Sequence, residues 1–117
     1  MKIVVVSPVV GGSFPAAVYC AKALKGLGHT VSFADMRIVA KDLTLWNNAQ
    51  KSQDPNLTRL SAAFYLKTEN IILEHAEVLR ADLVFALAQA PLRQGLLEEL
   101  QAKNIKTAFW FVEHYRR

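Results

Sequence analysis

The chain of 117 residues contains a single cysteine, Cys20, and no apolar run near the roughly 18 residues that a membrane-spanning helix needs. One cysteine excludes an internal disulfide and is typical of a protein kept in a reducing compartment. Met1 and Lys2 lead directly into a short apolar run without a small-residue cleavage site, so we expect no signal peptide. We therefore predict a cytoplasmic protein without a membrane span.

Nucleic-acid binding and metal binding both lack the sequence patterns that they require. The formal net charge is +4, but Lys and Arg form no run interleaved with aromatic residues. The three histidines and the one cysteine have no metal-ligand spacing. We expect no nucleic-acid partner, no metal and no cofactor, and the charge favours only mild attraction for a phosphate-bearing ligand.

The loop from Ser7 to Ser13 matches no established phosphate-binding motif. It contains Gly11 and Gly12, but it is neither G-x-G-x-x-G nor G-x-x-x-x-G-K-[ST]. It also lacks the clustered acids of a phosphoacceptor receiver and the cysteine loop of a low-molecular-weight phosphatase. The loop precedes a predicted helix, whose N-terminal amides favour anions, so Gly11, Gly12 and Ser13 are candidate substrate-binding residues. Close approach of the glycine backbone to a neighbouring loop is the alternative interpretation.

The sequence does contain an alternation of strand-like and helical segments. Apolar, β-branched runs predict strands at Lys2–Val6, Thr30–Ala34, Leu83–Ala88 and Lys106–Val112. Apolar residues at helical spacing predict helices over residues 14–27, 57–80 and 92–103. We therefore predict one Rossmann/flavodoxin-like α/β domain over residues 1–117: an open, doubly wound parallel sheet of four strands, order 2-1-3-4, with helices on both faces.

Finer expectations concern the weakly patterned segment and individual side chains. Residues 36–56 lack a strong period; a short helix over Lys41–Gln50 is predicted there, in a segment that is otherwise mobile or ligand-facing. The long helix is expected to place Leu60, Phe64, Ile71, His75 and Val78 along one face, with His75 hydrogen-bonded and partly buried. Trp110 is expected in the core rather than as a stacking platform, whereas either role is open for Trp46.

The order 2-1-3-4 places a ligand crevice between the first and third strands, because ligands bind where the strand order reverses. Residues 9–14 and 89–91 would wall it, which makes Gln89 a further candidate substrate-binding residue. Glu113 and His114 follow the last strand at the same edge. We expect His114 to act as a base or to bind a phosphate, and Glu113 to orient His114 or to hold a sugar hydroxyl; the alternative is that both lie in a solvated turn. Asp35, at the end of the second strand, lies where a nucleotide-binding fold would hold a ribose.

Two pairs of segments resemble a known enzyme family. The run from Met1 to Ser13 and the segment Gly28-His-Thr-Val31 resemble the start of a GT-B glycosyltransferase. The segments from Ala81 to Leu87 and from Ile105 to Glu113 are similar to the N-terminal domain of CgeB-type spore-maturation glycosyltransferases. In that family a W-F-x-D/E segment ends the corresponding strand, which Trp110, Phe111 and Glu113 match.

The resemblance implies two Rossmann-like domains facing a cleft. The N-terminal domain receives the sugar acceptor and the C-terminal domain holds the nucleotide-sugar, so we expect this chain to be the N-terminal part of a larger enzyme and inactive alone. Gly11, Gly12 and Ser13 would line the cleft, with Glu113 and His114 on its acceptor side. The alternative is a stand-alone flavodoxin-like ligand-binding or protein-interaction module without catalysis. In either case the exposed edges of a four-stranded sheet favour self-association into a homo-oligomer.

Overall fold

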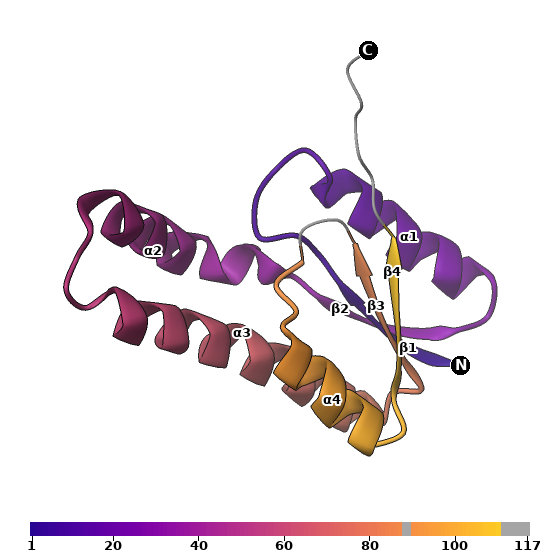
Figure 1. The fold of residues 1–117 in the computed structure, drawn as a ribbon. Coiled ribbons are helices and arrows are strands. Elements are labelled where there is room, and N and C mark those ends of the chain that lie inside the picture. The colour runs from indigo at the N-terminus through magenta and orange to yellow at the C-terminus, as the bar shows by residue number, and fades with distance from the viewer. Residues whose placement is uncertain (88–89, 111–117) are drawn as a thin grey trace, which may run out of the picture.

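A computed structural model describes residues 1–87 and 90–110, which fold around a parallel sheet (Figure 1). The sheet consists of β1 (Lys2–Val6), β2 (Thr30–Ala34), β3 (Leu83–Leu87) and β4 (Lys106–Trp110), in the order β2-β1-β3-β4. Val4 of β1 pairs with Ser32 on one side and with Val84 on the other. The predicted α/β class, the parallel sheet and the strand order are confirmed.

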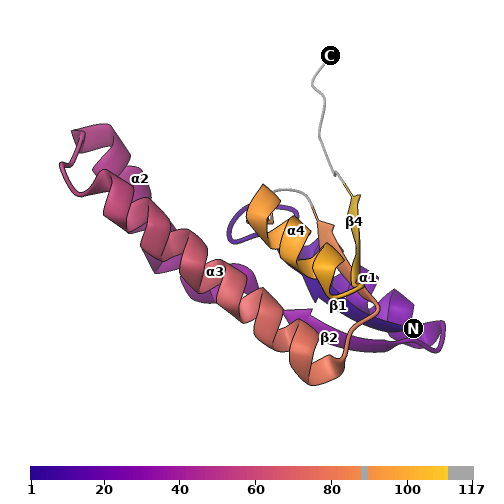
Figure 2. The ribbon, with the colours of Figure 1, turned by 60° about the horizontal axis from the view of Figure 1, so that its bottom comes forward.

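Helices cover both faces of this sheet. The helical segments are α1 (Phe14–Gly26), the 3₁₀ turn η1 (Met36–Val39), α2 (Ala40–Ser52), α3 (Leu57–Leu79) and α4 (Gln94–Ala102). Helix α1 lies on one face, and α3 and α4 lie on the other (Figure 2). Coverage on both sides suits β1, whose residues from Ile3 to Val6 are at most 2% exposed.

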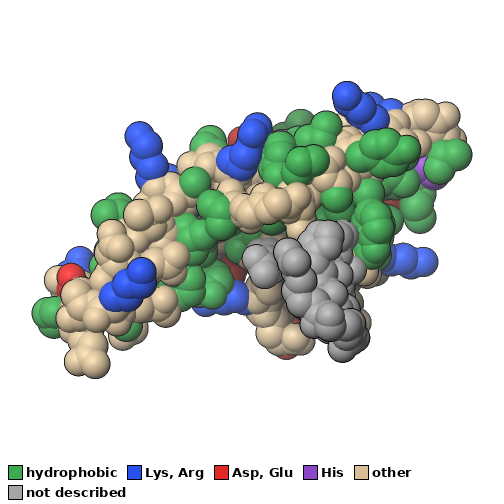
Figure 3. All heavy atoms as spheres, turned by 90° about the horizontal axis from the view of Figure 1, so that it is seen from above, with side chains coloured by type: hydrophobic (Ala, Val, Ile, Leu, Met, Phe, Trp, Pro, Cys, Tyr) green, Lys and Arg blue, Asp and Glu red, His purple; other side chains and the backbone are tan. Residues whose placement is uncertain are grey.

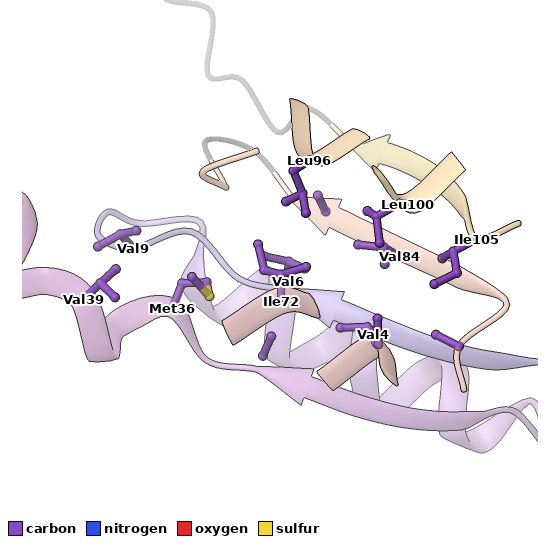
Figure 4. Close-up of a cluster of buried hydrophobic side chains, with 14 of the residues drawn as sticks. Val4, Val6, Val9, Met36, Val39, Ile72, Val84, Leu96, Leu100 and Ile105 are labelled. Atoms are coloured by element: carbon purple, nitrogen blue, oxygen red, sulfur yellow. The ribbon is translucent and has the colours of Figure 1, made fainter. Parts of the chain in front are cut away.

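The core consists of two apolar clusters separated by the sheet. Because side chains alternate along a strand, Val4 and Val6 point to one face and Ile3 and Val5 to the other. The larger cluster joins β1 and β3 to α3, α4 and η1, and Figure 4 shows Val4, Val6, Met36, Ile72, Val84, Leu96 and Leu100 within it. In the smaller cluster Ala17 and Ala21 of α1 pack against Ile3, Val5 and Leu87.

The weakly patterned segment of residues 36–56 is mostly helical. A helix over Lys41–Gln50 was expected, but η1 and α2 together occupy residues 36–52, so little of the segment is left as loop. Helix α2 packs chiefly on α3 and η1. Because α2 packs on these two elements rather than on the sheet, only a narrow stripe of its surface needs apolar residues, which explains the weak period of its sequence. We call α2 and the first half of α3 the α2–α3 arm, which projects from the sheet in Figures 1 and 2.

The buried face of α3 differs from the predicted one. Its fully or nearly fully buried residues recur every four positions, namely Phe64, Thr68, Ile72 and Ala76. Val78, expected on that face, is 82% exposed. The small residues Thr68 and Ala76 belong to this buried side, and a search for large apolar residues passes over them. His75 is partly buried as predicted, and its Nδ1 lies 2.7 Å from the hydroxyl of Ser32.

Trp110 was predicted in the core, and this prediction is wrong. Its side chain is 48% exposed and that of Phe109 is 44% exposed. Trp110 of β4 is the register partner of Leu87 of β3, so both side chains point to the face of the sheet that α1 covers. However, α1 lies over β1 and β2 and does not extend over β4. Among the described residues no helix covers that face of β4. The last two residues of the predicted strand, 111 and 112, lie outside the described part of the chain.

Candidate functional site

A pocket of about 350 Å³ opens at the carboxyl ends of β1 and β3. Its lining comes from the loop after β1 (Val9, Val10), the segment after β3 (Ala90, Pro91, Leu92, Arg93), α2 (Leu43, Trp46) and α3 (Phe64, Tyr65). The chain leaves β1 toward α1 on one face and leaves β3 toward α4 on the other. The pocket therefore lies at the point where the strand order reverses, the usual ligand position in open α/β sheets.

Two other hollows lie away from this edge. One of about 560 Å³ is lined by residues of α4 and by residues from Asn104 to Thr107, at the amino end of β4. Another of about 350 Å³ surrounds His75 on the outer side of α3 and β2. Because parallel α/β sheets bind ligands at the carboxyl ends of their strands, the pocket between β1 and β3 is the candidate site.

Three aromatic rings of the α2–α3 arm form one side of the pocket. Trp46 stacks on Phe64, with ring centroids 5.3 Å apart and planes 16° from parallel. Tyr65 meets both rings edge-on, at 5.6 Å from Trp46 and 5.4 Å from Phe64. The indole Nε1 of Trp46 donates a hydrogen bond to the hydroxyl of Ser61 at 2.6 Å. These contacts fix the ring orientations, so this side is apolar and already ordered.

Arg93 supplies a cationic group in the pocket lining. Its guanidinium carbon lies 4.5 Å from the centroid of the Tyr65 ring. Its Nε donates to Oε1 of Glu69 at 2.7 Å, and its Nη2 lies 2.6 Å from the same oxygen. The Glu69 side chain is 16% exposed, compared with 48% for Arg93. The carboxylate therefore offsets the charge of Arg93, whose guanidinium carries further N–H donors besides the two groups that contact Glu69.

Asp35 is held by Arg37 next to the start of α1. Its carboxylate accepts hydrogen bonds from the backbone amide of Arg37 at 3.1 Å and from Nη2 of the same residue at 2.7 Å. These bonds lower the pKa of Asp35 below its ordinary value. The Arg37 guanidinium lies 3.8 Å from the ring centroid of Phe14. The carboxylate expected near a ribose is thus already engaged by its own neighbour.

The loop from Ser7 to Ser13 lines the pocket with Val9 and Val10, but the candidate residues Gly11, Gly12 and Ser13 are not among the lining residues. Gly11 has a φ of 107°, a conformation that favours glycine, and Gly11 and Gly12 are both exposed. A Cβ added at either glycine would meet no described heavy atom within 4 Å, so neither glycine is required by close packing against a described part of the chain. Ser13 is half-buried at the N-cap of α1, without a side-chain capping bond.

The other predicted site residues, Gln89, Glu113 and His114, lie outside the described residues. The pocket residues that sequence analysis did not select are Phe64, Tyr65, Leu92 and Arg93, whereas Leu43 and Trp46 belong to the segment 36–56 that was expected to be mobile or ligand-facing. The adjacent aromatic residues Phe64 and Tyr65 were a visible signal, because a helix cannot bury both in one direction. No sequence pattern pointed to Arg93, because its partner Glu69 lies 24 positions away in the chain.

No protein-family model, curated protein or solved structure matches this chain. Within residues 1–87 and 90–110, no group of three His, Cys, Asp or Glu side chains is placed to hold a metal ion. No helix in that part of the chain has the length and apolarity to cross a membrane. Figure 3 looks onto the upper end of the view in Figure 1, where hydrophobic side chains lie among Lys and Arg and few acidic ones are visible.

Proposed function

We propose that the chain is the N-terminal, acceptor-side domain of a GT-B glycosyltransferase, which transfers a sugar from a nucleotide-sugar donor. The observation that carries this proposal is the pocket between the carboxyl ends of β1 and β3. The segments that resemble the family, from Met1 to Ser13 and from Ala81 to Leu87, contain these two strands. Because a Rossmann-like fold supports many activities, it is the combination of resemblance and pocket position that selects this one.

The chain's own residues would bind and orient the acceptor. The exposed backbone at Gly11 and Gly12 offers close approach to donor phosphates or to the acceptor, beside Ser13 at the start of α1. His114 would remove the proton of the attacking acceptor hydroxyl, with Glu113 orienting the imidazole. The nucleotide-sugar site would belong to a C-terminal domain, so the 117-residue chain alone would not transfer sugar.

The size of the native protein tests this proposal directly. An immunoblot of the source cells with an antibody against this domain should show a band far above 13.1 kDa. In that longer protein, His114→Ala should lower the turnover of nucleotide-sugar by roughly 10²-fold or more, the usual contribution of a general base. A native band at 13.1 kDa would overturn the proposal.

A stand-alone flavodoxin-like binding module is the second candidate. One observation favours it: described residues of this chain already form a pocket of about 350 Å³ without a second domain. The purified chain would then bind flavin mononucleotide with saturable quenching of the flavin fluorescence. An acceptor-side domain would leave that fluorescence unchanged.

A further inference from the structure

The candidate pocket has the size and lining of a small-molecule site. Its volume of about 350 Å³ falls in the range of roughly 300–1,000 Å³ found for ligand pockets. Nine of its ten lining residues are aliphatic, proline or aromatic, and the tenth is Arg93. An apolar lining with one or two polar groups at defined positions is the usual composition of such sites.

The aromatic side favours a flat ring as the apolar part of the ligand. Trp46, Phe64 and Tyr65 hold one another in stacked and edge-on contacts, so they present fixed ring faces and edges rather than adaptable chains. Ring systems gain from offset stacking and edge contacts in addition to the burial of their area. Val9 and Val10 on the sheet side complete an apolar slot.

The pairing of Arg93 with Glu69 selects the charge of the ligand. A carboxylate or phosphate that approached Arg93 would bring a second negative charge close to the largely buried Glu69. An uncharged oxygen can accept an N–H of Arg93 without that repulsion. The site therefore favours a neutral molecule over an acidic one.

We propose that this pocket binds an uncharged small molecule with a flat apolar ring system and a hydroxyl group, the ring between Val10 and Trp46 and the hydroxyl at Arg93. Such binding needs neither a second domain nor sugar transfer. Only the assignment of this compound as the sugar acceptor, through its hydroxyl, rests on the proposed function.

Two probes with the same ring separate neutral from acidic ligands. We would titrate the ¹⁵N-labelled chain with 2-naphthol and, separately, with 2-naphthoate near pH 7, and follow the Trp46 Nε1–H signal. That group is held by Ser61 in the aromatic cluster, so it reports on the pocket directly. We expect saturable shifts and a dissociation constant that is about fivefold lower for 2-naphthol. Equal or tighter binding of 2-naphthoate would overturn the proposal, as would the absence of saturation with 2-naphthol.

Two variants test the residues. Glu69→Gln keeps an oxygen for Arg93 but removes the carboxylate charge, so the preference should reverse toward 2-naphthoate; an unchanged preference would contradict the role of this pair.

Val10→Trp should fill the slot and weaken 2-naphthol binding at least about tenfold, with sheet amide signals showing retained folding. Val10 and Val78 are both exposed, at 52% and 82%, but Val78 lies outside this pocket, so Val78→Trp is the matched control and should bind like the wild type.

The outcomes separate this proposal from the glycosyltransferase assignment. Saturable 2-naphthol binding together with a native band at 13.1 kDa would leave the pocket established and sugar transfer refuted. Failure of the titrations together with an active longer enzyme would refute the pocket alone.

Discussion

The hydroxyl of Ser7 accepts a hydrogen bond from the backbone amide of Met36 at 2.8 Å and donates one to the carbonyl of Pro8 at 3.0 Å. Both Ser7 and Met36 are fully buried. Ser7 follows β1 directly, and Met36 begins η1 after β2. This one side chain therefore joins the loop that carries Val9 and Val10 to the segment that leads into α2, on two sides of the candidate pocket.

Replacing Ser7 by alanine should destabilise the fold measurably. The amide of Met36 would be left buried without its partner, which costs about 1–3 kcal/mol. Urea denaturation monitored by circular dichroism gives the change in unfolding free energy. Ser13→Ala is the matched control, because the Ser13 side chain makes no capping bond, and its change should stay within about 0.5 kcal/mol. Similar losses in the two variants would contradict the role assigned to Ser7.

Ile72→Ala should destabilise the protein far more than Val78→Ala. Ile72 is fully buried in the larger cluster, and truncating such a residue costs about 2–5 kcal/mol. Val78 lies on the same helix but is 82% exposed, so its truncation should change the unfolding free energy by about 0.5 kcal/mol or less. The same urea experiment distinguishes the observed face of α3 from the predicted one, for which Val78→Ala would be the costly substitution.

The Asp35–Arg37 pair should stabilise the protein at neutral pH but not in acid. The pKa of Asp35 is lowered in the folded chain by the hydrogen bonds from Arg37. Its contribution is therefore present above the ordinary carboxyl pKa and is lost as the pH falls through the folded-state pKa. The pair is exposed, so Asp35→Asn should cost about 0.5 kcal/mol near pH 6. Denaturation at several pH values should show that the difference in unfolding free energy between the wild type and Asp35→Asn vanishes in acid. A difference that stays constant with pH would exclude the ionic contribution.

The strands and their order could be predicted because the information is local. Two apolar runs, Lys2–Val6 and Thr30–Ala34, coincide with β1 and β2, since the turn residues around them limit their length. The βαβ connection then restricts the topology to few arrangements.

The pocket could be predicted only in its position. The expected crevice between the first and third strands coincides with the observed one at Val9, Val10, Ala90 and Pro91. Its other side depends on how α2 packs on α3, and this contact leaves only a faint period in the sequence. The pairing of Glu69 with Arg93 has no sequence signature, because it joins two elements through tertiary packing. Trp110 was misassigned because the exposure of an edge-strand residue depends on what covers the sheet.

The α2–α3 arm and the loops at the carboxyl end of the sheet line opposite sides of the candidate pocket. Leu43 and Trp46 belong to the arm, whereas Val9 and Ala90 belong to loops fixed to the sheet. The arm is attached through η1 and through the part of α3 that packs on β1 and β2. The separation of Val10 and Trp46 therefore depends on how the arm is set on the sheet at η1. A ligand bound between Val10 and Trp46 would contact the sheet side and the arm at once, so it would stabilise the arm in its present position.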